Sequence, residues 1–164
     1  MRVLPHFYFK SVTDITVSFL KEQSVRGVAV DIDNTLTEDN SFHIDEGTKK
    51  WVDTLKNSDI RICVVSNNHP DRVIPFVDQF EVPYIYEAKK PTRKSIVRLQ
   101  EILQTDAEHI AMIGDQIFTD MLFAYRCHFT SILVDAVGED NHRGAKLKRF
   151  FEKPLKSILR RRKI

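Results

Sequence analysis

The sequence lacks long apolar runs. Nowhere in its 164 residues is there a stretch of the roughly 18 to 20 apolar residues that a membrane-spanning helix needs. Residues 1–7 also lack the uninterrupted apolar core of a secretory signal. We therefore expect a cytoplasmic protein that does not cross a membrane.

Cysteine is scarce as well, and no repeat, low-complexity tract or linker interrupts the chain. The two cysteines are Cys63, inside an apolar run, and Cys127, near the end of an expected helix. Neither belongs to a metal-binding pattern of cysteine and histidine, so we expect both to be reduced, structural thiols. Without a linker, residues 1–164 are expected to form one domain.

The composition, with 42% apolar and 29% charged residues, argues against general disorder. The net charge is only +2, but basic residues gather near the C-terminus. Residues 146–163 contain nine Lys or Arg against one acid, Glu152, and apolar residues interleave with them at roughly helical spacing. This pattern predicts a basic helical segment at about 141–164. Such a segment could bind an anionic membrane, attract nucleic acid or pack its apolar face on the domain.

Apolar runs and amphipathic stretches alternate along the chain. We expect strands at residues 27–32, 60–65, 83–86, 109–113 and 131–134, separated by helices at residues 45–56, 70–80, 91–103 and 117–126. Continuously apolar strands that alternate with helices predict an α/β fold, a Rossmann-like three-layer α/β/α domain around a mainly parallel sheet. Ligands of such folds bind in the crevice at the carboxyl ends of the strands.

Two carboxylates follow the first of these strands. Asp31 and Asp33 are one residue apart, so on an extended chain both point into the same small space, and Thr35 follows them. An EF-hand loop is excluded, because Leu36 and Phe42 stand where that loop needs Gly and Glu. Taken alone, the pattern indicates either an acidic turn or the nucleophile of a phosphoryl transfer.

Polar residues follow three further strands. They are Ser66 and Asn67 after the second strand, Lys90 after the third, and Asp115 and Asp120 after the fourth. Each group alone could be a helix cap, a solvated lysine or a turn. Because the carboxyl ends of parallel strands share one edge, the four groups together predict a nucleophile, an acid/base, a phosphate cradle and a metal site.

With these four motifs in this order, the chain resembles the haloacid dehalogenase (HAD) superfamily of phosphotransferases. The segments that carry the resemblance are residues 31–36 (DIDNTL), 65–68 (VSNN), 88–91 (AKKP) and 114–120 (GDQIFTD). Their combination is similar to subclass IIIA, and within it to the YqeG-like family related to mitochondrial phosphatidylglycerophosphate phosphatases. The resemblance covers nearly the whole chain and implies a HAD-type phosphatase.

The resemblance also assigns the catalytic roles. Asp31 would be the nucleophile, which attacks phosphorus and forms an aspartyl-phosphate. Asp33 would first protonate the leaving alkoxide and then take a proton from the water that hydrolyses the intermediate.

The same resemblance implies a Mg²⁺ cofactor. Its ligands would be Asp31, the backbone carbonyl of Asp33, and Asp115. Asp120 would complete the shell or orient it through water, and Thr35 would position the loop. Oxygen ligands of this kind suit Mg²⁺.

Phosphate binding is assigned in the same way. Ser66, the backbone amide of Asn67 and Lys90 would hold the phosphoryl oxygens. The pair Lys89 and Lys90 leaves two candidates for the lysine, and Lys90 is favoured because it directly precedes Pro91.

The gaps between the motifs are too short for the cap domain that many members of the superfamily carry. An open, capless site suits a phosphate on a large body, so the preferred substrate is phosphatidylglycerophosphate, hydrolysed to phosphatidylglycerol at the inner face of a membrane. The alternative substrates are polynucleotide ends, a phosphoprotein or a soluble phosphate ester. A non-catalytic module that binds a membrane or nucleic acid is an alternative function. No stable nucleic-acid partner is expected, and the sequence leaves the oligomeric state open.

Overall fold

A computed structural model, which describes residues 4–138, contains a parallel sheet of six strands in the order β1-β6-β5-β2-β3-β4. The strands are β1 (Phe7–Phe9), β2 (Gly27–Val30), β3 (Arg61–Val65), β4 (Tyr84–Ile85), β5 (Ile110–Gly114) and β6 (Thr130–Val134). The expected parallel α/β fold is thus confirmed. The basic segment at about 141–164 lies outside the described residues.

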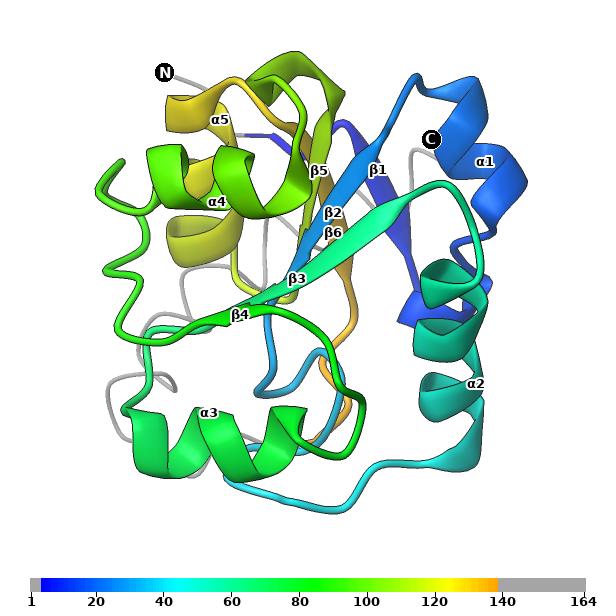
Figure 1. Cartoon of the computed structure of the whole chain (residues 1–164), viewed down its shortest axis with the longest axis vertical. Coiled ribbons are helices and arrows are strands. Elements are labelled where there is room, and N and C mark those ends of the chain that lie inside the picture. Colours follow the sequence, from blue (N-terminus) through cyan, green and yellow to red (C-terminus); the bar gives the residue numbers. More distant parts are fainter. Residues whose placement is uncertain (1–3, 139–164) are drawn as a thin grey trace.

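Helices cover both faces of this sheet (Figure 1). The α-helices are α1 (Val17–Glu22), α2 (Glu46–Lys56), α3 (Pro70–Val77), α4 (Ile96–Leu103) and α5 (Leu122–Cys127). Short helical turns are η1 (Val12–Asp14), η2 (Ala107–His109) and η3 (Ile117–Met121), the last of them a π-helix. Helices α4 and α5 lie on one face, and α1, α2 and α3 pack on the other, which gives the three layers.

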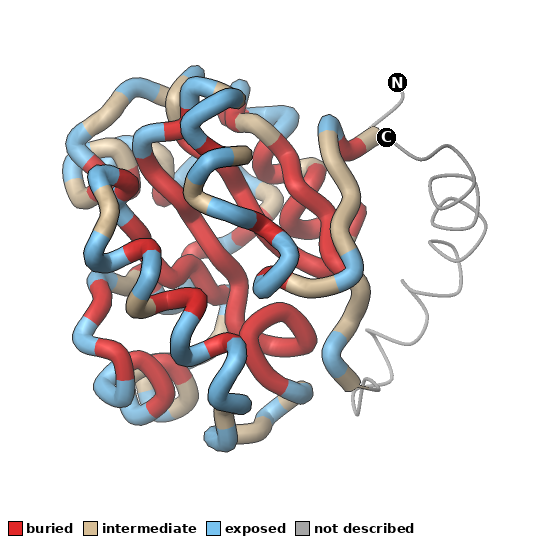
Figure 2. Tube along the Cα trace, turned by 90° about the vertical axis from the view of Figure 1, so that its right-hand side faces the viewer, coloured by how far each residue is buried: buried red, intermediate tan, exposed pale blue. Residues whose placement is uncertain are grey.

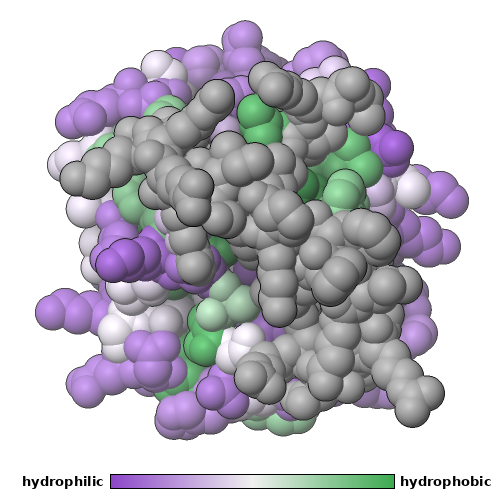
Figure 3. Space-filling model, turned by 180° about the vertical axis from the view of Figure 1, so that it is seen from behind, coloured by the Kyte–Doolittle hydropathy of each residue, from purple (hydrophilic) through white to green (hydrophobic). Residues whose placement is uncertain are grey.

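The central strands are apolar on both sides because both sides are covered. In β2, Val28 and Val30 join the core on the α2 side, whereas Ala29 joins the core on the α4 side. Cys63 of β3 and Cys127 of α5 are both free and buried. Buried residues therefore form the interior in Figure 2, and hydrophilic side chains form much of the periphery in the view of Figure 3.

The structure corrects three of the expected elements. Helix α4 begins at Ile96 rather than at residue 91, because residues 91–95 form turns in which the amide of Thr92 bonds to the carbonyl of Lys89. The helix expected at 117–126 starts as the π-helical η3. The N-terminal strand β1, which the sequence patterns did not indicate, adds an edge to the sheet beside β6.

All six strands run the same way, so the carboxyl ends of β2, β3, β4 and β5 meet at one edge of the sheet. The loops that follow these ends are joined to each other. The amide of Ala88 bonds to the carbonyl of Ser66, and the amide of Glu87 to that of Asn68. Within the described residues, none of the helices is both long and apolar enough to span a bilayer.

Candidate active site

The loop after β2 turns sharply around a buried residue. The carbonyl of Ile32 accepts hydrogen bonds from the amides of Thr35 and Leu36, at 3.1 and 2.8 Å. The turn requires a positive φ of 59° at Asn34, a conformation that asparagine tolerates better than most residues. Asp31 and Asp33 flank Ile32, and both are almost completely buried.

Lys90 lies at the centre of the site. Its Nζ atom is 2.8 Å from Oδ1 of Asp31 and 2.7 Å from Oδ1 of Asp120, and its side chain is 1% exposed. The neighbouring Lys89 is exposed to solvent. The structure therefore brings Lys90, rather than Lys89, to the carboxylates.

Asn67 fixes the backbone from which Lys90 extends. Its side-chain Nδ2 donates to the carbonyl of Lys90 at 2.8 Å, and its Oδ1 accepts from the Lys90 amide at 2.7 Å. The expected role of Asn67, a backbone amide on phosphate, stays a prediction, but its side chain has this second task. Ser66 is buried beside it, and the Ser66 hydroxyl accepts from the amide of Asn68.

A buried acidic cluster surrounds the lysine. Among the described residues, carboxylate oxygens of Asp31, Asp115 and Asp120 lie within 4.8 Å of one another. Asp120, expected to complete the metal shell or to orient it through water, is thus as central to the cluster as the other two. Thr35 stands at the edge of the cluster, with its hydroxyl 3.4 Å from Oδ1 of Asp115.

This cluster carries more negative charge than one lysine can balance. Burial raises the pKa of Asp31 to about 8; Lys90 opposes the shift, and Asp120 and Asp115 add to it. Burial works against the charge of Lys90, but the two carboxylates it contacts, first that of Asp120, raise its pKa above the ordinary value. A divalent cation would relieve the remaining repulsion. Carboxylate oxygens are the ligands that Mg²⁺ prefers, so the donor set fits such a site.

Gly114 leaves the space that Asp120 occupies. A Cβ atom at position 114 would lie 2.3 Å from Oδ2 of Asp120, and no side chain can be accommodated at that distance. The same Oδ2 accepts a hydrogen bond from the amide of Gln116 at 3.2 Å. The glycine that precedes Asp115 therefore allows the two carboxylates of this loop to approach the sheet.

Asp33 faces a different set of partners. Its Oδ1 accepts from Nη2 and Nε of Arg72, at 2.8 and 3.2 Å, and from the amide of Asn40 at 3.0 Å. Its Oδ2 accepts from Nδ2 of Asn68 at 2.6 Å. The Asp33 side chain is not in the group that could hold a metal, and its expected contact through the backbone carbonyl stays a prediction.

Sequence reasoning missed Arg72 and Asn40, and it placed Asn68 in the second motif without expecting a contact with Asp33. An arginine in the first turn of a helix is usually solvated, and nothing in the residues around position 72 marks it as different. The one available signal was its place, in the helix that directly follows the Ser66 motif.

Comparison with known proteins gives three kinds of similarity. Residues 1–137 match the model of a family described as mitochondrial PGP phosphatase. A protein of Bacillus subtilis (strain 168), "Probable phosphatase YqeG", is 33% identical over 159 residues, which are 97% of this chain and 92% of the relative.

Solved structures share the fold at lower identity. The cobalt-bound form of the deoxy-D-mannose-octulosonate 8-phosphate phosphatase (YrbI) from Haemophilus influenzae has a TM-score of 0.53 and 17% identity, over 70% of each chain. An uncharacterised protein from Listeria monocytogenes serotype 4b has a TM-score of 0.58 and 14% identity, over 72% of this chain and 85% of the other.

Proposed function

Since the chain belongs to the mitochondrial PGP phosphatase family, and is thus a HAD-type phosphatase, we propose that it hydrolyses phosphatidylglycerophosphate with Mg²⁺ and an aspartyl-phosphate intermediate on Asp31. One observation carries this proposal. A single buried lysine, Lys90, contacts two carboxylates of a three-carboxylate cluster at the carboxyl edge of the sheet. Such a group of charges is costly to bury for stability alone.

In the proposed first step, a carboxylate oxygen of Asp31 attacks phosphorus. The bond between phosphorus and the alcohol oxygen breaks, and Asp33 gives its proton to the departing alkoxide. In the second step, water attacks phosphorus while Asp33 takes a proton from it, and the bond to Asp31 breaks. Inorganic phosphate and the free enzyme result. Lys90 and Ser66 hold the phosphoryl oxygens in both steps.

The cation would be held by Asp31 and Asp115, together with the backbone carbonyl of Asp33. When bound, Mg²⁺ supplies positive charge that draws the phosphate group in and stabilises the charge of the transition state. Asp120, whose Oδ1 contacts Lys90, either completes this set or fixes it through water. The Lys90 contact also holds Asp31 in place before substrate enters.

The substrate proposal rests on the family and on the open site. The segment between Asp33 and α2 is a loop, and the segment between Ser66 and Lys90 holds only α3, β4 and short turns, so neither gap contains a cap domain. A site without a cap can reach a headgroup that stays in its bilayer. Polynucleotide ends, a phosphoprotein and a soluble ester are the alternatives.

A panel of phosphate esters tests this proposal. We expect purified protein to release phosphate from phosphatidylglycerophosphate in vesicles more efficiently than from 3′-phosphorylated DNA, a phosphopeptide or glycerol phosphate. EDTA should reduce the rate to background, because it removes the cation that balances the negative charge of the carboxylate cluster. Adding Mg²⁺ in excess should restore the rate. Full activity in EDTA would contradict the metal proposal. A preference for polynucleotide ends or a soluble ester would overturn the lipid as substrate.

The basic segment gives a separate prediction. Each basic residue near an anionic bilayer contributes about 1 kcal/mol, so changing Arg160, Arg161 and Arg162 to Ser should weaken binding to phosphatidylglycerol vesicles. The effect should shrink at high salt, where exposed charges are screened.

A matched control for this triple variant changes Lys49, Lys50 and Arg98 to Ser, which removes the same charge from exposed positions of the described domain. Vesicle binding is measured by co-sedimentation, and turnover of a soluble ester should be the same in both variants. Equal loss of binding in both would show that net charge, rather than this segment, attracts the membrane.

A further inference from the structure

We infer that Arg72 is a positioning residue that fixes the carboxylate of Asp33 so that its Oδ2 atom carries the proton of the reaction. This inference rests on the proposed function, in which Asp33 is the acid and base. It adds to that proposal a residue from α3 and an assignment of one oxygen.

The contact between Arg72 and Asp33 is short and shielded from solvent. Both Nη2 and Nε of Arg72 donate to the same oxygen, Oδ1, at 2.8 and 3.2 Å. The two side chains are only 11% and 12% exposed. Charge-assisted hydrogen bonds in such surroundings are stronger and more directional than those on an open surface.

The two oxygens of Asp33 are therefore not equivalent. Oδ1 accepts three hydrogen bonds, two from Arg72 and one from the amide of Asn40. Within the described residues, Oδ2 accepts one hydrogen bond, from Nδ2 of Asn68 at 2.6 Å. A carboxylate oxygen has about two lone-pair sites, so Oδ1 is saturated and Oδ2 keeps the capacity to bind and release a proton.

Arg72 is itself held by aromatic rings. Its guanidinium carbon lies 4.9 Å from the ring centre of Phe42, in the loop before α2, and 5.1 Å from that of Phe76 in α3. Contacts of this kind fix the plane of the guanidinium. Because that plane is fixed, the fork of Nε and Nη2 also fixes the direction of the carboxylate.

The test compares two leaving groups in a single turnover. Glycerol phosphate needs a proton on its departing oxygen, whereas 4-nitrophenyl phosphate does not. We expect Arg72→Met to slow alcohol release from glycerol phosphate by about 10-fold or more, and release of 4-nitrophenolate by less than about threefold. Arg72→Lys, which keeps the charge and stem but lacks the fork, should show the same selectivity if the orientation matters.

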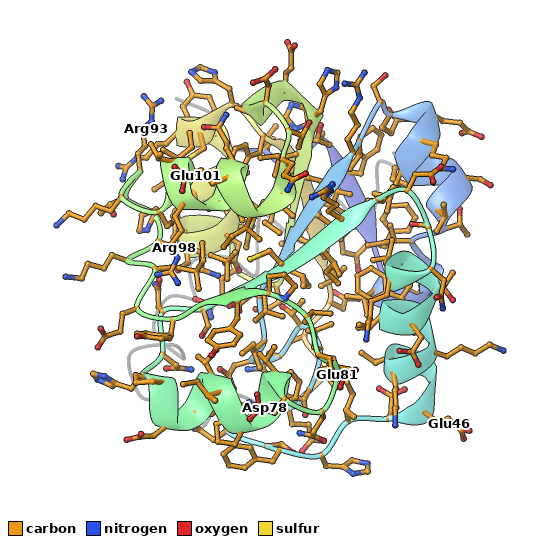
Figure 4. All side chains as sticks on the ribbon, in the orientation of Figure 1. Glu46, Asp78, Glu81, Arg93, Arg98 and Glu101 are labelled. Atoms are coloured by element: carbon orange, nitrogen blue, oxygen red, sulfur yellow. The ribbon has the colours of Figure 1, made fainter. Side chains whose placement is uncertain are left out.

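A double-mutant cycle shows whether Arg72 acts through Asp33. In an Asp33→Asn background, Arg72→Met should add less than about a twofold further loss with glycerol phosphate, because its target is already gone. Arg98→Met is the matched control, since Arg98 is exposed on α4 (Figure 4), and it should change neither rate.

The possible outcomes distinguish a failure of the role of Arg72 from a failure of the proposed phosphatase mechanism. Equal losses with both esters, or losses that multiply with those of Asp33→Asn, would overturn the role of Arg72 and leave the phosphatase proposal standing. If Asp33→Asn itself released glycerol at the native rate, Asp33 would not be the acid, and both ideas would fail. Thermal melting of each variant identifies loss of folding, and Arg72→Lys then decides the question.

Discussion

Replacing Asp31 by Asn should reduce phosphatase turnover by about three orders of magnitude or more, because an amide nitrogen or oxygen cannot replace the carboxylate as nucleophile. Two further losses add to this effect. The variant lacks one oxygen ligand of the cluster with Asp115 and Asp120, and it weakens the 2.8 Å contact with Lys90 Nζ. The measurement is initial phosphate release at saturating substrate and Mg²⁺.

Intact mass adds a direct reading of the same prediction. Native protein quenched during turnover should carry a phosphate on Asp31, and Asp31→Asn should carry none. Asp78→Asn is the control, since Asp78 is an exposed carboxylate at the end of α3 (Figure 4), and it should behave as the native protein. Near-native turnover in Asp31→Asn, or a phosphate on another residue, would contradict the aspartyl-phosphate mechanism.

The second large effect is expected at Lys90. Lys90→Met removes the one ammonium that contacts both Asp31 and Asp120, so two buried carboxylates lose their partner. Breaking a buried ion pair from one side costs about 3 to 5 kcal/mol of unfolding free energy. Because we propose that Lys90 holds the phosphoryl oxygens, its loss should also lower turnover by about 100-fold or more.

Lys89→Met is the matched control, because it makes the same chemical change one residue away, at an exposed position. It should change the unfolding free energy by about 0.5 kcal/mol at most and turnover by less than about twofold. Urea unfolding and initial rates of the two variants give the comparison. If Lys89→Met were the damaging one, the assignment of Lys90 would be wrong.

The strand ends could be predicted from the sequence because the central strands are covered on both faces. The sequence of β2 is apolar throughout, and Asp31 is the first polar residue after it. Asp31 therefore marks the carboxyl edge of the sheet. The same reasoning placed Ser66 and Asp115 at this edge. The structure joins their loops to Lys90 through Asn67 and Asp120.

Other features depend on contacts that no local pattern contains. The predicted start of α4 at residue 91 was wrong. We had expected it there because a proline commonly opens a helix. Here, however, the side chain of Asn67, from another loop, binds the backbone of Lys90 directly before Pro91, and the helix begins only at Ile96. The partner of Asp33 was missed because Arg72 and Asp33 are 39 positions apart. The strand β1 has only three residues, too few for a periodicity to emerge.

The pairing of β1 with β6 has a consequence for how the protein is made. Residues 7–9 leave the ribosome early, but the partner strand, in which Phe7 lies opposite Ile132, emerges more than a hundred residues later. At synthesis rates of about 5 to 20 residues per second, the N-terminal strand waits several seconds for its neighbour. Phe7 and Phe9 can pack on Phe19 of α1 soon after synthesis, but the backbone donors and acceptors on the β6 side of β1 have no strand to pair with during that interval.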